Sequence, residues 1–133
     1  MPNPNLLIKG LEKVSNDKYQ LAGYETNEEL VIGDIYTFTL YGELGEGRHV
    51  FKIYDQASWN HQTTLEEIAP NLYSASFNFN PNFKDQRAYL NVYMDRDEPA
   101  GITTIHWAKL EKGSSYTPQV AMFDCLYQQI KNK

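Results

Sequence analysis

Cysteine and long apolar runs are the first things that this 133-residue sequence lacks. Its one cysteine, Cys125, cannot form a disulfide within the chain, which fits folding in a reducing compartment. The longest apolar runs, such as Leu6–Ile8 and Leu30–Ile32, are far shorter than the roughly 20 residues that span a bilayer. No basic stretch followed by an apolar one opens the chain, so no signal peptide is predicted. These absences exclude an integral membrane protein and favour assembly without Sec export.

Basic charge is scarce as well. Twelve Lys and Arg stand against 17 Asp and Glu, and the net charge is −5 at pH 7. A chain with this balance would repel a phosphate backbone, so nucleic acid is not an expected partner.

Residues that could carry catalysis or bind a metal are few. The three histidines include no pair at the i, i+4 spacing of a zinc-binding helix. Cys125 has no basic neighbour or local motif that would activate its thiol. The acidic turn at Asp95–Glu98 lacks the ligand pattern of an EF-hand calcium loop. We therefore predict no enzymatic activity, no metal site and no cofactor; a structural calcium ion has no support in the sequence.

What the sequence does have is a succession of short β-type runs. Helical periodicity is nearly absent, aromatic residues reach 14%, and turn residues end the runs about every 10 to 15 positions. This spacing predicts an all-β sandwich or barrel in a single domain. The expected strands are Asn5–Ile8, Tyr19–Thr26, Ile35–Tyr41, His49–Tyr54, Leu72–Phe79, Arg87–Asp95 and Thr103–Leu110.

Alternation along two of these runs assigns their faces. In Leu72–Phe79, the aromatic side is expected to face the core and the Ser and Asn side to face water. In the run that ends at Asp95, the aliphatic side chains Ala88, Leu90, Val92 and Met94 point one way, and Tyr89, Asn91, Tyr93 and Asp95 point the other way.

This second set predicts a saccharide-binding surface, because sugar C–H faces stack on aromatic rings while amides and carboxylates bond to hydroxyls. Trp59 and His61, in a polar loop, are further candidates for the same role. A structural interpretation stays open, since tyrosine is a good strand residue at half-exposed positions and a loop tryptophan can cap a core. Trp107, in an apolar run, is expected to lie in the core.

Two segments carry helical signals. Thr63–Ile68 is expected to form a helical turn, with a threonine cap and glutamates in its first turn. Val120–Lys133 places apolar residues three or four positions apart, which predicts an amphipathic helix. Its residues Phe123, Tyr127 and Ile130 are the candidates for docking on a partner.

Three stretches of the chain carry a resemblance to a known family. The stretch Ile102–Pro118 contains Leu110-Glu111-Lys112-Gly113 followed by Thr117-Pro118, the chain opens with Asn3–Leu7, and Leu30–Leu40 includes Gly33-Asp34-Ile35-Tyr36-Thr37. In this order they resemble strands of the carbohydrate-binding-module-like jelly rolls found in bacteriophage tail, baseplate and fibre proteins.

The resemblance implies a jelly-roll sandwich of two antiparallel sheets over residues 1–118, with residues 119–133 as a helical or extended C-terminal appendage. It implies a non-enzymatic virion protein, made in the host cytoplasm, that contributes to attachment to a host-surface saccharide. Other virion tail proteins and further copies of the chain are the implied partners. Two positions depart from the family: His106 stands where calcium-binding members often have Asp, and Gln119 stands where Trp is usual.

Two alternative functions stay open at the level of sequence. The chain could be an assembly or decoration protein that docks on another virion protein without binding sugar. It could also be a small glycan-active enzyme that uses Asp95 or Asp97.

Overall fold

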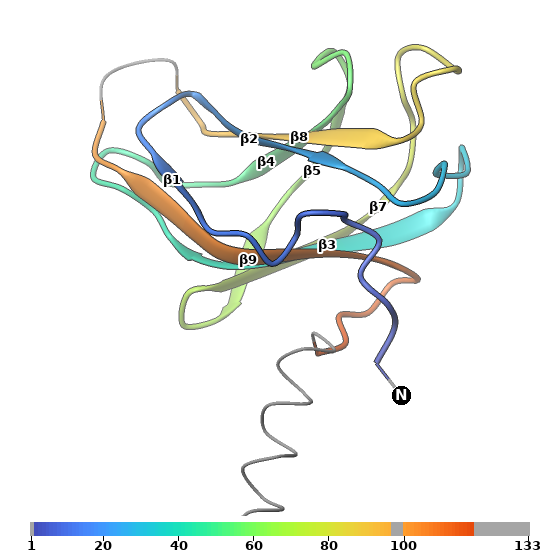
Figure 1. Ribbon diagram of the computed structural model, residues 1–133. Helices are drawn as coiled ribbons and strands as arrows, with labels where there is room; N and C mark the ends of the chain where they lie inside the picture. The colour runs from blue at the N-terminus through green and yellow to red at the C-terminus, as the bar shows by residue number, and fades with distance from the viewer. Residues whose placement is uncertain (1, 97–99, 119–133) are drawn as a thin grey trace, which may run out of the picture.

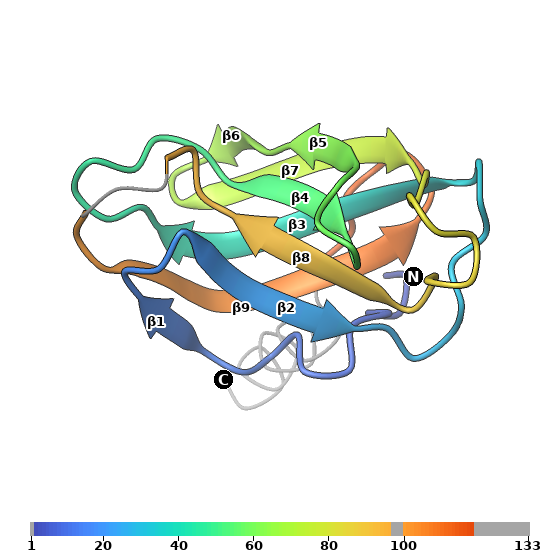
Figure 2. The same cartoon turned by 90° about the horizontal axis from the view of Figure 1, so that it is seen from above.

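The protein is a sandwich of two antiparallel sheets (Figure 1). The computed structural model describes residues 2–96 and 100–118. Within these residues the strands are β1 (Val14–Asn16), β2 (Gln20–Glu25), β3 (Ile35–Glu43), β4 (Lys52–Asp55), β5 (His61–Thr64), β6 (Glu66–Ala69), β7 (Leu72–Asn78), β8 (Tyr89–Tyr93) and β9 (Thr103–Lys112). One sheet has the order β1-β9-β3-β7-β6 and the other β2-β8-β4-β5 (Figure 2). The chain passes from sheet to sheet at most steps, as in a jelly roll, and the predicted all-β sandwich is confirmed.

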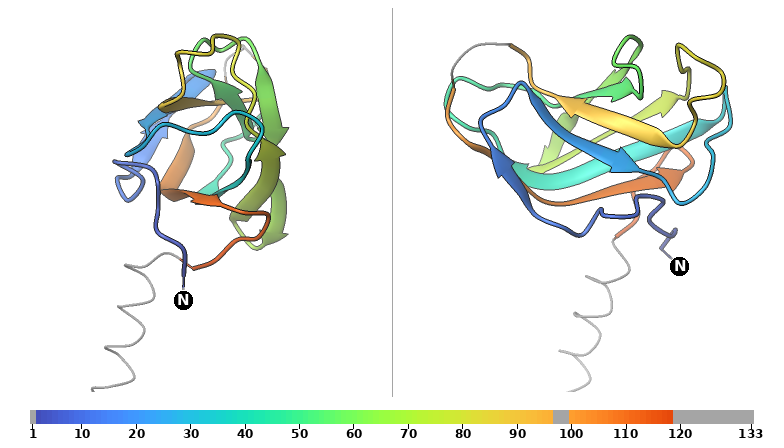
Figure 3. Two further views of the ribbon diagram at one scale, coloured as in Figure 1. Left: turned by 90° about the vertical axis from the view of Figure 1, so that its right-hand side faces the viewer. Right: turned by 45° about the horizontal axis from the view of Figure 1, so that its top comes forward.

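The core lies between the two layers, which Figure 3 shows from the end and tilted forward. Strand β3 occupies the centre of its sheet, antiparallel to both β7 and β9. Its inward side chains Tyr36, Phe38 and Leu40 are fully buried, as are Leu90 and Val92 of β8 in the opposite sheet. Burying each such side chain contributes roughly 1.5–3 kcal/mol, so these two central strands anchor the fold.

The predicted faces of β7 and β8 are largely confirmed. Phe77 and Phe79 belong to the core, with Tyr73 and Ala75 packed against it. Ser74 and Asn91 are exceptions, because both are buried although they lie on the predicted outer faces; the Ser74 hydroxyl lies 2.8 Å from that of Thr39.

The predicted strand at Asn5–Ile8 is wrong, because the side chain of Asn5 takes the place of strand backbone. Its Oδ1 accepts hydrogen bonds from the N–H groups of Leu7 (3.0 Å) and Leu110 (3.1 Å), and its Nδ2 donates to Ala108 O (2.9 Å). These bonds hold the segment beside β9, while regular pairing is reduced to a single bridge between Leu7 and Thr26. Leu6 and Leu7 still reach the core.

The predicted helical turn at Thr63–Ile68 is wrong as well. The segment contains the end of β5 and most of β6, which belong to different sheets. Leu65 is the crossing point: its side chain is buried and its N–H donates to Phe51 O at 2.9 Å. Leu65 places one apolar side chain in the core at the point where the chain changes sheet. The threonines before it belong to β5 and the glutamates after it belong to β6, so polar strand residues lie on both sides of the crossing.

Trp107 does not lie in the core, contrary to expectation. The register of β9 against β3 shifts between Tyr41 and Gly42, so that Tyr41 pairs with Trp107 while Gly42 pairs with Ile105. This bulge inserts His106 as an extra residue and changes which side chains point outward. Trp107 is therefore half-buried on the outer face, where its ring stacks on that of Tyr41 at 6.2 Å.

The two ends of the sandwich meet beneath the five-stranded sheet (Figure 1). The backbone N–H of Asn3 donates to Thr117 Oγ1 at 2.9 Å. The predicted appendage at 119–133, with its docking candidates Phe123, Tyr127 and Ile130, lies outside the described residues, as does Asp97.

Candidate functional site

A row of aromatic rings crosses the outer face of the four-stranded sheet. Tyr19 precedes β2, Tyr93 ends β8, Tyr54 lies on β4, and His61 begins β5. Successive ring centroids are 5.1 Å apart for Tyr19 and Tyr93, 5.2 Å for Tyr93 and Tyr54, and 5.4 Å for Tyr54 and His61. Each contact is edge-to-face, so the rings form a ridged surface that presents both ring faces and ring edges.

The middle of this row is hollowed into a shallow cup. Tyr19, Tyr54 and Tyr93 line it together with Ser58, and its volume is about 250 Å³. The hydroxyl of Tyr93 donates to Ser58 Oγ at 2.8 Å, which brings two hydroxyl groups to the same wall. The cup therefore offers aromatic surface and hydroxyl hydrogen-bonding groups side by side, which is the combination that a sugar ring requires.

Asn91 supports the cup from below. Its side chain is only 2% exposed, although it belongs to the predicted outer row. Its Nδ2 donates to Asp55 O (3.0 Å), Gln56 O (3.2 Å) and Ser58 Oγ (2.9 Å), and its Oδ1 accepts from Gln20 Nε2 (3.1 Å). With its amide fully engaged, Asn91 positions Ser58, and its role in the site is indirect.

Asp55 organises the loop that rims the cup. It is 1% exposed, and its Oδ1 accepts from the N–H groups of Trp59 (2.9 Å) and Asn60 (3.0 Å). Its Oδ2 accepts from Asn82 N at 2.7 Å, which ties the loop to a second one. Ser58 adopts a positive φ of 60°, and the Trp59 side chain projects outward with 75% of its surface exposed.

The other predicted residues are spread along the sheet. His61 ends the aromatic row, and its Nε2 lies 2.9 Å from Thr64 Oγ1. Tyr89 lines a separate hollow of about 320 Å³ with Ile8, Lys9, Gly23 and Glu25. Its hydroxyl lies directly over Gly23, where any side chain would collide with it. Tyr89 is therefore not part of the cup.

Asp95 is engaged by His49 at the end of the sheet nearest Tyr93. Its Oδ1 accepts from His49 N at 3.0 Å, and its Oδ2 lies 2.9 Å from His49 Nδ1. Burial by itself would raise the pKa of Asp95, but the hydrogen bonds from His49 outweigh that effect and lower the pKa to about 2. A carboxylate held ionised in this way is a structural partner of His49 rather than a proton donor.

Sequence reasoning missed Tyr19, Tyr54, Ser58 and Asp55. The outward direction of Tyr54 could have been predicted by alternation, because the apolar residue Ile53 beside it points inward. Asp55 could have been predicted to cap the polar loop that follows it, because Asp side chains commonly accept hydrogen bonds from the backbone of such loops. Their proximity to Tyr93 could not be predicted from the sequence, because it depends on the position of β8 between β2 and β4 in the sheet.

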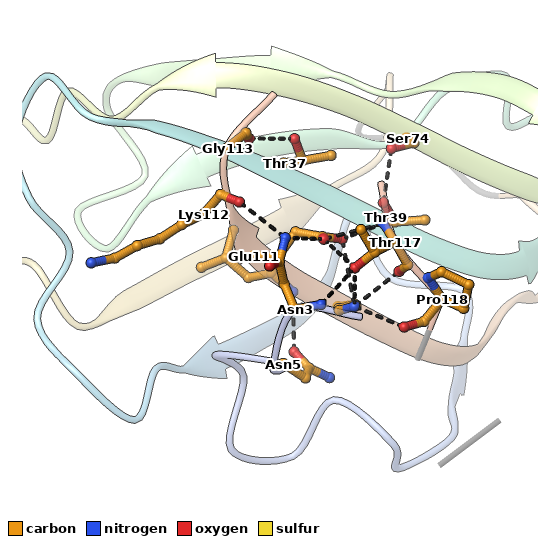
Figure 4. Close-up of polar contacts among 12 residues, drawn as sticks. Asn3, Asn5, Thr37, Thr39, Ser74, Glu111, Lys112, Gly113, Thr117 and Pro118 are labelled. Carbon is orange, nitrogen blue, oxygen red and sulfur yellow. Dashed lines mark hydrogen bonds and ion pairs between the residues drawn. The ribbon is translucent and has the colours of Figure 1, made fainter. Parts of the chain in front are cut away.

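The opposite face of the sandwich carries a buried ionic clasp (Figure 4). Lys109 and Glu111 are fully buried, with Lys109 Nζ 3.7 Å from Glu111 Oε2. Lys109 Nζ donates to Thr117 O, Thr117 Oγ1 and Pro118 O, each at 2.9 Å. Glu111 Oε1 accepts from Thr117 Oγ1 at 2.6 Å and from Asn3 Nδ2 at 3.1 Å. Burial lowers the pKa of Lys109, an effect that Glu111 opposes.

Next to the clasp lies an apolar patch. Trp107 stacks between Tyr41 (6.2 Å) and Tyr116 (6.5 Å). Tyr41 and Trp107 also line a hollow of about 410 Å³ with Ala69, Pro70 and Leu72. Its lining is almost entirely apolar, unlike that of the cup, so this patch suits a protein surface better than a sugar.

The described residues contain no group of three or more His, Cys, Asp or Glu side chains placed to hold a metal ion. Nor does any helix in that part of the chain have the length and apolar character needed to cross a bilayer. No protein-family model matches the chain, and no curated protein matches it in sequence. A functional assignment therefore has to be argued from the site.

Proposed function

We propose that the protein is a non-enzymatic, saccharide-binding β-sandwich module. The observation that carries the proposal is the row Tyr19, Tyr93, Tyr54 and His61, with the cup at its centre. Aromatic faces bind sugar C–H groups, and the hydroxyls of Ser58 and Tyr93 supply polar partners in the same hollow. The exposed Trp59 at the rim adds a further stacking surface.

We further propose a role in a bacteriophage virion, as part of the tail, baseplate or fibre, where the module contributes to attachment to host-surface glycans. The resemblance of Ile102–Pro118, Asn3–Leu7 and Leu30–Leu40 to phage jelly rolls supports this role. The arrangement of the faces supports it too. The ends of the sandwich meet on the five-stranded sheet, so a module tethered there would present its aromatic row outward.

A glycan array of bacterial surface saccharides tests the proposal. The full chain is expected to bind at least one saccharide, and Tyr93→Ala or Tyr54→Ala to weaken that binding roughly tenfold by removing a stacking ring. Tyr41→Ala is the matched control, since it removes an exposed tyrosine from the opposite sheet. The assignment would be contradicted if the wild-type chain bound no saccharide on the array, or if Tyr41→Ala weakened binding as much as Tyr93→Ala does.

The apolar patch favours a second candidate, an assembly protein that docks on another virion protein or on a second copy. A hollow lined by Tyr41, Trp107 and Leu72 is the kind of exposed apolar surface that protein interfaces cover. Light scattering on the full chain is expected to show an oligomer that Trp107→Ser dissociates. A monomer in both proteins would exclude docking on a second copy, and saccharide binding that depends on Tyr93 would then favour the first function.

A further inference from the structure

We propose that the saccharide held at the cup carries an anionic group, a carboxylate or a phosphate, and that Lys52 binds it. The inference rests on the proposed function, because it names the charge class of the ligand for the same site.

Lys52 is the basic residue placed beside the central ring of the row. It begins β4 and pairs across the sheet with Tyr93 of β8. The next residue, Ile53, is fully buried, so alternation directs the Lys52 side chain to the outer face that carries Tyr93. Directly opposed residues have Cβ atoms about 4.5–5.5 Å apart. Lys52 does not itself line the cup, but its flexible four-carbon stem starts on the same face of the sheet as Tyr93, which does.

Two acidic residues on β8 and β4, or just beyond these strands, are already engaged. Both oxygens of Asp95 contact His49, and the two oxygens of the buried Asp55 accept three backbone N–H groups. Within the described residues, the side chain of Lys52 forms no ion pair or hydrogen bond. Its ammonium group is therefore available to a ligand.

The charge of the rest of the chain makes this lysine a specificity determinant. A chain with a net charge of −5 repels an anionic glycan at long range, so binding of such a ligand needs a local positive charge. Asp17 and Lys18, which precede Tyr19, have opposite charges and cancel. Lys52 is thus the residue that can offset the repulsion at the centre of the row, and its charge-assisted hydrogen bond would favour the acidic form of a sugar over the neutral one.

The test compares matched pairs of glycans. An array carries uronate-containing saccharides beside their carboxyl-reduced forms, and phosphate-substituted saccharides beside their dephosphorylated forms. The wild-type chain is expected to prefer the acidic member of a pair, and Lys52→Met to lose about tenfold or more of that affinity while leaving neutral saccharides unaffected. Lys52→Arg is expected to retain binding. Lys112→Met, at the exposed end of β9 on the other sheet, is the matched control for charge.

The outcomes separate the two proposals. Binding that depends on Tyr93 but is equal for acidic and neutral members, or unchanged in Lys52→Met, overturns the anionic ligand and leaves saccharide binding intact. Absence of any saccharide binding overturns both. Which of the two pair types shows the preference decides between carboxylate and phosphate. Weakening of the preferred interaction between 50 and 500 mM NaCl, absent in Lys52→Met, is the expected signature of the ion pair.

Discussion

Tyr24 carries a hydroxyl that the core does not satisfy. The side chain is 3% exposed and packs 6.1 Å from the ring of Phe38, and its Oη finds no hydrogen-bond partner among the described residues. Burial accordingly raises the pKa of this phenol above its ordinary value. The buried hydroxyl therefore lowers the stability of the fold, because it lies in apolar surroundings without a hydrogen bond.

Replacing Tyr24 with Phe is therefore expected to stabilise the protein by roughly 1 kcal/mol, because it removes a polar group that is buried without a partner and keeps the ring. Urea unfolding of both proteins measures the change. Tyr36→Phe is the matched control, since the Tyr36 hydroxyl accepts from Val31 N at 2.8 Å and its loss is expected to destabilise. A lower stability for Tyr24→Phe would show that the hydroxyl has a partner in solution.

The Asp95–His49 pair gives the stability a dependence on acid pH. The pKa of Asp95 is about 2 in the fold against an ordinary value of 3.8, so its contribution is present above pH 4 and is lost as the pH falls towards 2. Because the His49 side chain is largely exposed, solvent screening reduces the full contribution to roughly 1 kcal/mol. Asp95→Asn is expected to be less stable than wild type at pH 6, and the two proteins to converge near pH 2. Chemical denaturation of both proteins across this pH range measures the difference in stability. A difference that does not change with pH would show that the Asp95–His49 pair makes no pH-dependent contribution.

At the level of elements, the side chain of Asn5 adds to the few backbone hydrogen bonds that hold the first segment of the chain. Asn5 donates to Ala108 O and accepts from Leu7 N and Leu110 N, which are bonds that strand backbone would otherwise supply. Asn5→Asp keeps the acceptors but places a carboxylate oxygen against the Ala108 carbonyl. Both Asn5→Asp and Asn5→Ala are expected to lose roughly 2–4 kcal/mol of stability, since each leaves buried backbone groups unpaired. Asn27→Ala, which removes an exposed 3.4 Å bond to Asn5 O, is the control and should change little.

The strands were predictable wherever alternation was regular. The run Ile35–Tyr41 matches β3, and Leu72–Phe79 matches β7, because their inward residues alternate without interruption. Alternation failed where a side chain replaced backbone, as at Asn5, and where the bulge at His106 changed the phase of β9. These features depend on a neighbouring strand, which a periodicity within one segment does not record.

The candidate site was predictable only in part for the same reason. The outward direction of Tyr93 follows from the pattern of its own strand, and the exposure of Trp59 follows from its polar loop. That Tyr19 and Tyr54 flank Tyr93 depends on strand order, since β2 and β4 are far apart in sequence from β8. The burial of Asn91 depends on the loop that Asp55 folds over it.

For the whole molecule, the clasp of Lys109, Glu111 and Thr117 decides how the ends are held. Glu111→Leu leaves the buried Lys109 ammonium without its counter-charge, and a loss of about 3–5 kcal/mol is expected. The double variant Lys109→Met with Glu111→Leu removes both charges and is expected to be closer to wild type than either single change. A double-mutant cycle from urea unfolding measures the coupling; additive losses would mean that the two charges act independently.

The bond between Asn3 and Thr117 has a consequence for how the module can be combined with other proteins. Because the first and last described parts of the sandwich meet at 2.9 Å, the whole sandwich can be inserted into a surface loop of a host protein without forcing that loop apart. The same closeness permits a circular permutant, in which a short linker joins Asn3 to Thr117 and new ends open in an exposed loop away from the cup. The sandwich can thus be attached at a single point and still keep every strand pairing that shapes its aromatic row.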